Sequence, residues 1–311
     1  MEGEVIATYV TRRVLLLLPV LLGVSLGSFA LLHLVPGDPA MILAGQEATE
    51  EVLARIRHEH GLDQSLPAQF LVYLGNAVRG NLGISIQSRQ PVATLIAERF
   101  PFTLRLAFLA ILVSAALGVV AGVVAATRRN SILDIVALLG SLVGISLPIF
   151  WLGLLVMLVF SVRLQWFPAG GSGTAAHLVL PALVLGAASS GVIARMTRAS
   201  MLEVLRQDYV RTARAKGIGE RVVIYRHALK NAMIPILTVF GLEFGYNLGG
   251  AVLTETVFSL PGIGRLIVEG IFARDYPVVQ GAMLVVATTF VAVNLFTDVA
   301  YAFFDPRIRY E

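Results

Sequence analysis

The chain contains six apolar stretches that are each long enough to cross a lipid bilayer. A helix needs about 20 predominantly apolar residues to span roughly 30 Å of hydrocarbon. Helices are favoured over a barrel because lipid offers the backbone no hydrogen-bond partner and because the alternation of barrel strands is missing. The sequence therefore predicts an all-α membrane protein, with residues 1–311 forming one transmembrane domain of about six spans. The expected spans are Val10–Val35, Phe102–Thr127, Ile132–Val162, His177–Met196, Ala232–Phe258 and Val278–Phe304.

Composition excludes an ordinary soluble protein. Mean hydropathy is +0.80 and only 14% of residues are charged, which is too few to furnish a water-facing surface. The chain has no cysteine, so disulfides, thiolate metal sites and cysteine nucleophiles are excluded. It also lacks a GxxxxGK[ST] phosphate loop, an HExxH helix and a Ser/His/Asp arrangement, so no catalytic residue is expected. His33 and His177 are isolated, which argues against a metal site.

The placement of basic residues predicts the orientation. They gather at the ends of apolar runs rather than along a groove suited to nucleic acid, and basic residues favour the cytoplasmic side of short loops. With the N-terminus inside, the cytoplasmic segments hold Arg12, Arg13, Arg128, Arg129, the basic connection 197–232, Arg307 and Arg309. The later outer loops hold only Arg163, Arg265 and Arg274. Both termini are therefore expected in the cytoplasm, with the first helix retained rather than cleaved.

Residues 36–100 are expected to form an extracytoplasmic loop with structure of its own. The stretch TEEVLARIRHEHGLD predicts a short helix that Thr49 caps and Gly61 ends. PAQFLVYLGNAVRGNLG is a second amphipathic stretch. The loop is either a lid on the membrane surface or a platform for a substrate-delivering protein, and the sequence leaves both open.

The connection between the fourth and fifth spans is the longest polar segment on the cytoplasmic side. It predicts two short helices, the first running through QDYVRTARAK to Gly217 and Gly219, and the second running from Glu220 to Asn231. Pro235 is expected to begin the fifth span. Small residues with basic side chains around them suit docking of this segment into a cleft of a soluble partner protein. The alternative is a basic helix held by anionic lipid, which predicts more apolar anchors than Tyr209 and Val210 supply.

The segments ARAKGIG and RHALKNAMIP resemble the cytoplasmic coupling loop of binding-protein-dependent ABC importer permeases. Thr212 stands where the family's Glu-Ala-Ala pattern has its acid, followed by Ala213, Arg214 and Gly217. Further passages are similar to the B-type permease of the dipeptide and oligopeptide branch: LVPGDPA, GLDQSLPAQFLVYLGNAVRGNLGIS, SLPIFWLG, ETVFSLPGIGRL, DYPVVQG and DPRIRY. The residues that the resemblance implies for coupling to an ATPase are Tyr209, Arg211, Thr212, Ala213, Arg214, Ala215, Lys216 and Gly217.

The resemblance implies a type I ABC importer permease in the plasma membrane of a bacterium or archaeon. Its implied partners are a second, similar permease, two cytoplasmic ATPase subunits and an extracytoplasmic binding protein, with ATP and Mg²⁺ handled by the ATPases and no cofactor on this chain. The implied substrates are dipeptides or oligopeptides, with nickel or glutathione-like substrates as alternatives. A different class, a stand-alone ion-coupled transporter, would need a buried carboxylate relay.

Several polar residues interrupt the apolar spans, where ionisable groups are costly and face a partner or a cavity. Glu243 and Asn247 lie four residues apart on one face of the fifth span, and Glu255 follows. They line a translocation pathway or hold helices together, and both interpretations stay open. Asp134 and Asp298 are expected to be structural, pairing with Arg12, Arg13 or Arg129. Pro148 predicts a kink or tilt in the third span.

Overall fold

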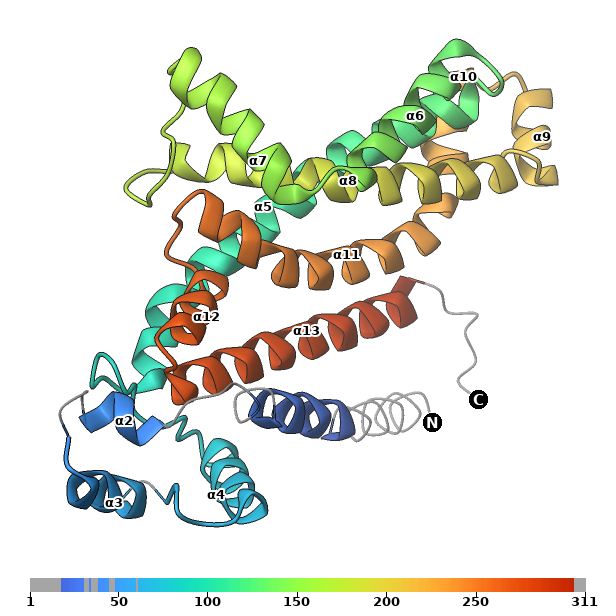
Figure 1. Ribbon diagram of the computed structural model, residues 1–311. Coiled ribbons are helices and arrows are strands. Elements are labelled where there is room, and N and C mark those ends of the chain that lie inside the picture. The colour runs from blue at the N-terminus through green and yellow to red at the C-terminus, as the bar shows by residue number, and fades with distance from the viewer. Residues whose placement is uncertain (1–17, 31–33, 35–38, 45–47, 60, 305–311) are drawn as a thin grey trace, which may run out of the picture.

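The computed structural model describes residues 18–304 except for residues 31–33, 35–38, 45–47 and 60 (Figure 1). Its regular elements in these ranges are helices, apart from an isolated antiparallel bridge between Ile84 and Pro91. The helix Leu18–Ala30 comes first. The labelled elements are α2 (Pro39–Ala44), α3 (Glu50–Glu59), α4 (Leu66–Val78), α5 (Val92–Thr127), α6 (Ile132–Ser146), α7 (Ile149–Met157), η1 (Leu158–Arg163), α8 (Ala176–Val204), α9 (Asp208–Ala215), α10 (Glu220–Val222), η2 (Val223–Leu229), α11 (Lys230–Val257), α12 (Ile263–Phe272) and α13 (Tyr276–Phe304).

Four helices are long and apolar enough to cross a membrane, and a bent pair raises the number to five if it counts as one span. They lie at Val92–Thr127, Ala176–Val204, Glu220–Gly249 and Tyr276–Thr297, and the pair joins Ile132–Ser146 to Ile149–Arg163. The all-α membrane fold is therefore confirmed. Much of the first expected span, Val10–Val35, lies outside the described residues, so a total of six spans stays a prediction.

The third expected span, Ile132–Val162, is not one helix. The helix axis bends by 101° between its two halves, Ile132–Ser146 and Ile149–Arg163. Leu147 is extended (ψ 129°) and Pro148 sits at the start of α7, as expected of a residue that precedes a proline and so avoids the helical region. The predicted kink at Pro148 is therefore confirmed, and the chain turns sharply enough at this elbow to divide the segment into α6 and α7–η1.

The fifth span begins earlier than expected. A helix runs without a break from Glu220 through the π-helical segment η2 into α11, and Pro235 lies inside it. The prediction of a separate helix ending at Asn231, with Pro235 opening the span, was wrong. Buried Ala232 and Ile236 on either side of the proline pack in one cluster with Met201 of α8, and this packing keeps the chain helical past the proline.

Close approach of α5 and α8 forms the centre of the bundle, and glycines allow it. A Cβ at Gly122 would lie 2.6 Å from the carbonyl oxygen of Ala194, and one at Gly118 would lie 2.7 Å from the Cβ of Ile193. Small residues permit such backbone approach between membrane helices, where van der Waals packing replaces the hydrophobic effect. Larger side chains at either glycine would force α5 and α8 apart.

The two polar connections lie at opposite ends of the long helices (Figure 1). Helices α2, α3 and α4 gather at the end where α5 begins, together with α12, whereas α9 lies beyond the far end of α8. This agrees with the expectation that the loop 36–100 and the connection 197–232 face opposite sides of the membrane. Which of these sides is cytoplasmic stays a prediction.

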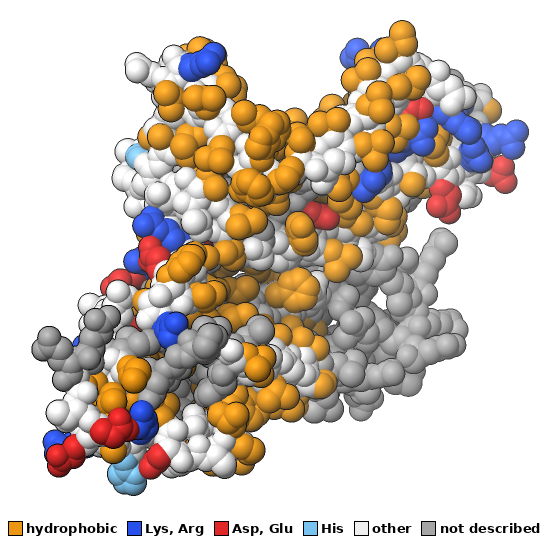
Figure 2. Space-filling model, in the orientation of Figure 1, with side chains coloured by type: hydrophobic (Ala, Val, Ile, Leu, Met, Phe, Trp, Pro, Cys, Tyr) orange, Lys and Arg blue, Asp and Glu red, His pale blue; other side chains and the backbone are white. Residues whose placement is uncertain are grey.

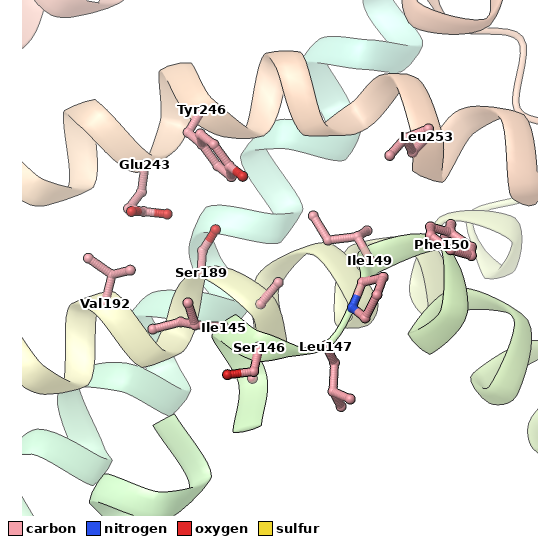
Figure 3. Close-up of a pocket in the computed structure, with 13 residues that line it drawn as sticks. Ile145, Ser146, Leu147, Ile149, Phe150, Ser189, Val192, Glu243, Tyr246 and Leu253 are labelled. Atoms are coloured by element: carbon pink, nitrogen blue, oxygen red, sulfur yellow. The ribbon is translucent and has the colours of Figure 1, made fainter. Parts of the chain in front are cut away.

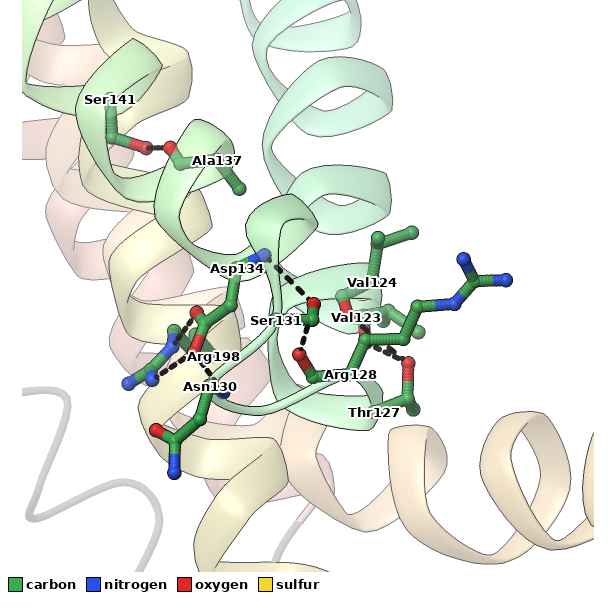
Figure 4. Close-up of polar contacts among 10 residues, drawn as sticks. All are labelled: Val123, Val124, Thr127, Arg128, Asn130, Ser131, Asp134, Ala137, Ser141 and Arg198. Atoms are coloured by element: carbon green, nitrogen blue, oxygen red, sulfur yellow. Dashed lines mark hydrogen bonds and ion pairs between the residues drawn. The ribbon is translucent and has the colours of Figure 1, made fainter.

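An ion pair joins the start of α6 to α8. Arg198 donates from Nε and Nη2 to the two carboxyl oxygens of Asp134 at 2.7 and 2.8 Å, and the backbone N–H of Asn130 donates to the same carboxyl at 3.0 Å (Figure 4). The expected structural role of Asp134 is confirmed, but its ion-pair partner is Arg198 and not Arg129 as predicted. The side chain of Asp298, like Arg12 and Arg13, lies outside the described residues.

Replacing Arg198 with leucine is expected to lower the melting temperature of the protein, because Asp134, whose side chain is only 4% exposed, would lose both of its guanidinium donors. Arg195→Leu is the matched control, since Arg195 lies on the exposed face of the same helix. The measurement is the melting temperature of each detergent-purified variant. Equal melting temperatures for the two variants would show that the pair does not hold α6 in place.

Candidate functional site

Helix α9 packs against the chain through one narrow face. Val210 and Ala213 are buried against Val223 of η2, with Val204, Leu205 and Ile218 around them. The other α9 side chains are exposed, as are Lys216 and Gly217. Of the eight expected coupling residues, Ala213 therefore belongs to the inner face of the helix and not to a surface open to a partner.

The C-terminus of α9 is closed by a left-handed glycine. Gly217 has φ +75°, its N–H donates to the carbonyl of Arg214 at 2.9 Å, and the N–H of Ile218 donates to Ala213 at 3.3 Å. These two bonds and the apolar contact of Ile218 form a Schellman motif, which satisfies the last helical carbonyls. Because only glycine adopts this conformation at no cost, Gly217 determines where α9 ends.

Polar contacts tie α9 to the helix that follows. Arg214 donates to both carboxyl oxygens of Glu220 at 2.7 and 3.1 Å, and this hydrogen bonding raises the pKa of the Arg214 guanidinium. Asn231 donates to the Tyr209 hydroxyl at 3.0 Å. Figure 2 shows the basic side chains gathered at this end of the molecule. The helix is thus held as one unit with α10 and η2, with its basic outer face exposed.

A cavity of about 550 Å³ opens between the elbow, α8 and α11 (Figure 3). Residues 144–150 of the elbow form one wall, and α8 contributes Ser189 and Val192. Glu243 and Tyr246 of α11 close it. The cavity is lined by apolar side chains with a few polar groups, the composition typical of ligand sites.

The three expected pathway residues do not share one place. Glu243 lines the cavity, whereas Asn247 is fully buried beside it and accepts a hydrogen bond from Ser189 at 2.8 Å. Glu255 does not line the cavity and is 1% exposed. The three residues of α11 therefore have different surroundings: Glu243 lines the cavity, Asn247 bonds to α8, and Glu255 is buried near the C-terminal end of the helix.

Glu255 instead holds three helices together. Its carboxyl accepts the Thr103 hydroxyl of α5 at 2.6 Å and the backbone N–H of Arg265 in α12 at 3.1 Å. Thr103 in turn accepts the N–H of Ile263 at 2.8 Å, so two side chains from other helices cap the N-terminus of α12. A Cβ at Gly262 would collide with the Glu255 carboxyl.

Another buried carboxyl was not among the residues predicted from the sequence. Asp275, between α12 and α13, accepts the Ser85 hydroxyl and the backbone N–H groups of Ile86 and Gln87. It thereby fixes the end of the loop 36–100 to the turn between α12 and α13. The motif DYPVVQG contains Asp275, but its partners lie 188 to 190 residues away and no local pattern points to them.

The chain matches two family models. Residues 118–310 match the binding-protein-dependent transport system inner membrane component, and residues 6–107 match the N-terminal membrane component of the same systems. The chain belongs to this family. The predicted resemblance to ABC importer permeases is thereby confirmed, as is a multi-pass protein of the inner membrane.

Relatives place this permease within the family. It is 44% identical over 330 residues to the dipeptide transport system permease protein DppB of Alkalihalophilus pseudofirmus, in a match that covers 97% of this chain and 99% of the relative. It is 47% identical over 303 residues to the glutathione transport system permease protein GsiC of Escherichia coli, with the same coverage. These full-length likenesses confirm the predicted dipeptide and oligopeptide branch.

A solved structure supports the fold. The permease superposes on a chain of the MetNI methionine ABC transporter in an inward-facing conformation with a TM-score of 0.59 and 16% identity. The match covers 68% of this permease and 96% of that chain. The ABC importer permease fold is therefore confirmed.

Proposed function

We propose that this permease is one half of the channel of an ATP-driven importer for small peptides, either dipeptides or glutathione-like peptides. The names of its full-length relatives, which are a dipeptide permease and a glutathione permease, support this substrate class. The other half of the channel is a second, similar permease. The assembly lies in the plasma membrane of a bacterium or an archaeon, and residues 1–311 form one permease domain.

The coupling segment is the connection 197–232, with α9 as its docking element. The observation that carries this proposal is the unbroken helix from Glu220 to the cavity residue Glu243. Helix α9 is fixed to the base of that helix through Val210 and Val223, and by the pair of Arg214 with Glu220. A push on α9 by an ATPase therefore reaches the cavity wall without crossing a flexible joint.

The outer loop 36–100 is proposed to receive an extracytoplasmic binding protein. Helix α3 has Glu50, Glu51 and Arg55 exposed to water, as suits contact with a soluble partner. The end of the loop is held by Asp275 at the turn before α13. Binding at the loop would thus act on a segment that is fixed to the membrane domain.

ATP and Mg²⁺ are proposed to be handled by two cytoplasmic ATPase subunits, with no cofactor and no catalytic residue on this chain. Among the described residues, no group of three His, Cys, Asp or Glu side chains could hold a metal ion. The chain would then contribute the pathway and the docking surface, and its partners the energy.

Reconstitution in proteoliposomes tests the proposed function. The complete importer, with both permeases, both ATPases and the loaded binding protein, is expected to move a labelled dipeptide or glutathione only when ATP is present on the side that the ATPases face. Omitting the ATPases is expected to abolish uptake. Uptake by this permease alone, driven by an ion gradient, would contradict the proposal and favour a stand-alone transporter.

A further inference from the structure

The cavity at the elbow contains one acidic side chain. Of its thirteen lining residues, Glu243 alone carries a carboxyl, beside the hydroxyls of Ser146, Ser189 and Tyr246. The remaining side chains are apolar or absent, with Ile145, Leu147, Ile149, Phe150, Val192 and Leu253 among them. Figure 3 shows Glu243 and Tyr246 projecting from α11 toward the α8 wall that carries Ser189 and Val192.

Glu243 is half-buried, and it differs from the buried acids Asp134, Glu255 and Asp275 in its partners. Asp134 is held by Arg198, and Glu255 and Asp275 accept hydrogen bonds from neighbouring elements. No Lys, Arg or His among the described residues forms an ion pair with Glu243. A half-buried carboxylate that has hydroxyl groups beside it but no basic partner is electrostatically unfavourable, so the site favours a cation that arrives from outside the chain.

The size of the cavity limits what that cation is. About 550 Å³ lies within the range of small-ligand pockets, which runs from roughly 300 to 1,000 Å³. Ile145, Leu147 and Phe150 of the elbow offer apolar surface to a side chain of the solute and no side-chain hydrogen-bonding group that would select one side chain over another. A solute with an ammonium group at Glu243 and a variable apolar group against the elbow would match both the acidic part and the apolar part of the lining.

We propose that Glu243, with Tyr246 and Ser189 beside it, forms a transit subsite for the ammonium group of an amine-bearing solute. The subsite selects cationic over anionic groups and tolerates varied side chains along Ile145, Leu147 and Phe150. Identifying the ammonium as the N-terminus of a peptide rests on the proposed function. The charge selection itself follows from the cavity and can be tested without peptide import.

A single cysteine can report the charge of the cavity, because the natural chain has none. The probe is Val192→Cys, on the α8 wall of the same cavity, in the assembled importer in membranes. This cysteine is labelled with two methanethiosulfonate reagents, one carrying a cationic trimethylammonium group and the other an anionic sulfonate group. Each labelling rate is divided by the rate at which the same reagent reacts with a free thiol in solution. The ratio of cationic to anionic labelling is expected to be about 10, the order produced by one nearby charge in a partly hydrated site.

Adding Glu243→Gln to the reporter is expected to bring that ratio close to 1, whereas adding Glu269→Gln should leave it unchanged. Glu269 is an acid of α12 paired with Arg265, away from the cavity lining. A ratio that Glu243→Gln does not alter, or a reporter thiol that neither reagent reaches, would overturn the subsite.

Uptake separates this proposal from the proposed function. In the complete importer, Glu243→Gln without the reporter cysteine is expected to slow import of a peptide with a free N-terminus about 10-fold, while the ATPase rate stimulated by the binding protein persists. Unaltered import would overturn the role of Glu243 in peptide transit. If the unsubstituted importer moves no peptide but the labelling ratio still depends on Glu243, then the peptide assignment fails and the cation subsite stands.

Discussion

Replacing Gly217 with valine is expected to lower ATP-dependent uptake by about tenfold or more, since a left-handed conformation costs an L-residue roughly 1–2 kcal/mol and a β-branched one at least that. Gly217 has φ +75° and closes the last turn of α9 through its bond to Arg214. Valine is expected to shift the chain out of this conformation and to unwind the end of α9. The measurement is initial uptake in proteoliposomes, together with the amount of ATPase that copurifies.

Gly219→Val provides the matched control. Gly219 lies two residues further on at φ −58°, and neither glycine has an atom within 4 Å of its expected Cβ position. The two substitutions thus add the same side chain in open space and differ in backbone strain. Equal uptake by the two variants would show that the closed end of α9 is not needed for coupling.

Replacing Glu255 with alanine is expected to give the largest loss of stability, about 3 kcal/mol or more, because buried donors would be left without an acceptor. The Thr103 hydroxyl and the Arg265 N–H lose their partner, and α12 loses part of its N-terminal cap. Limited proteolysis of the purified protein should show new cleavage between α11 and α12. A lower melting temperature should accompany it.

Two further variants define the effect of Glu255. Glu255→Gln retains one acceptor oxygen and is expected to fall between the wild type and the alanine variant. Thr256→Ala changes an exposed neighbour that bonds only within its own helix and should be close to the wild type. If Glu255→Ala melts like Thr256→Ala, the three-helix contact contributes nothing to the stability of the end where α12 begins.

The fold class and the family were predictable from the sequence because both depend on long or numerous signals. Apolar runs of about 20 residues or more and several ordered motifs do not depend on tertiary contacts. The elbow was signalled only by Pro148, and a proline by itself does not determine whether a helix bends or turns back. The start of the fifth span was misplaced because packing of Ala232 and Ile236 overrides the usual effect of Pro235.

The contacts between side chains of different helices could not be predicted from the sequence. Asp134 meets Arg198 across 64 residues, and Glu255 meets Thr103 across 152. Such pairs are set by how the helices cross, which no local pattern encodes. The placement of Glu243 and Asn247 on one face of a helix was predictable, yet their division into cavity and packing roles needed the position of α8.

The central claim is that α9 is the surface on which an ATPase subunit acts to move the cavity wall. Photo-cross-linking tests it directly, with a photoreactive residue in place of exposed Ala215 and a control in place of exposed Leu71 on α4. In intact membranes, a cross-link to the ATPase subunit is predicted from position 215 and not from position 71. No ATPase cross-link from position 215, with the complex shown to be assembled, would contradict the claim.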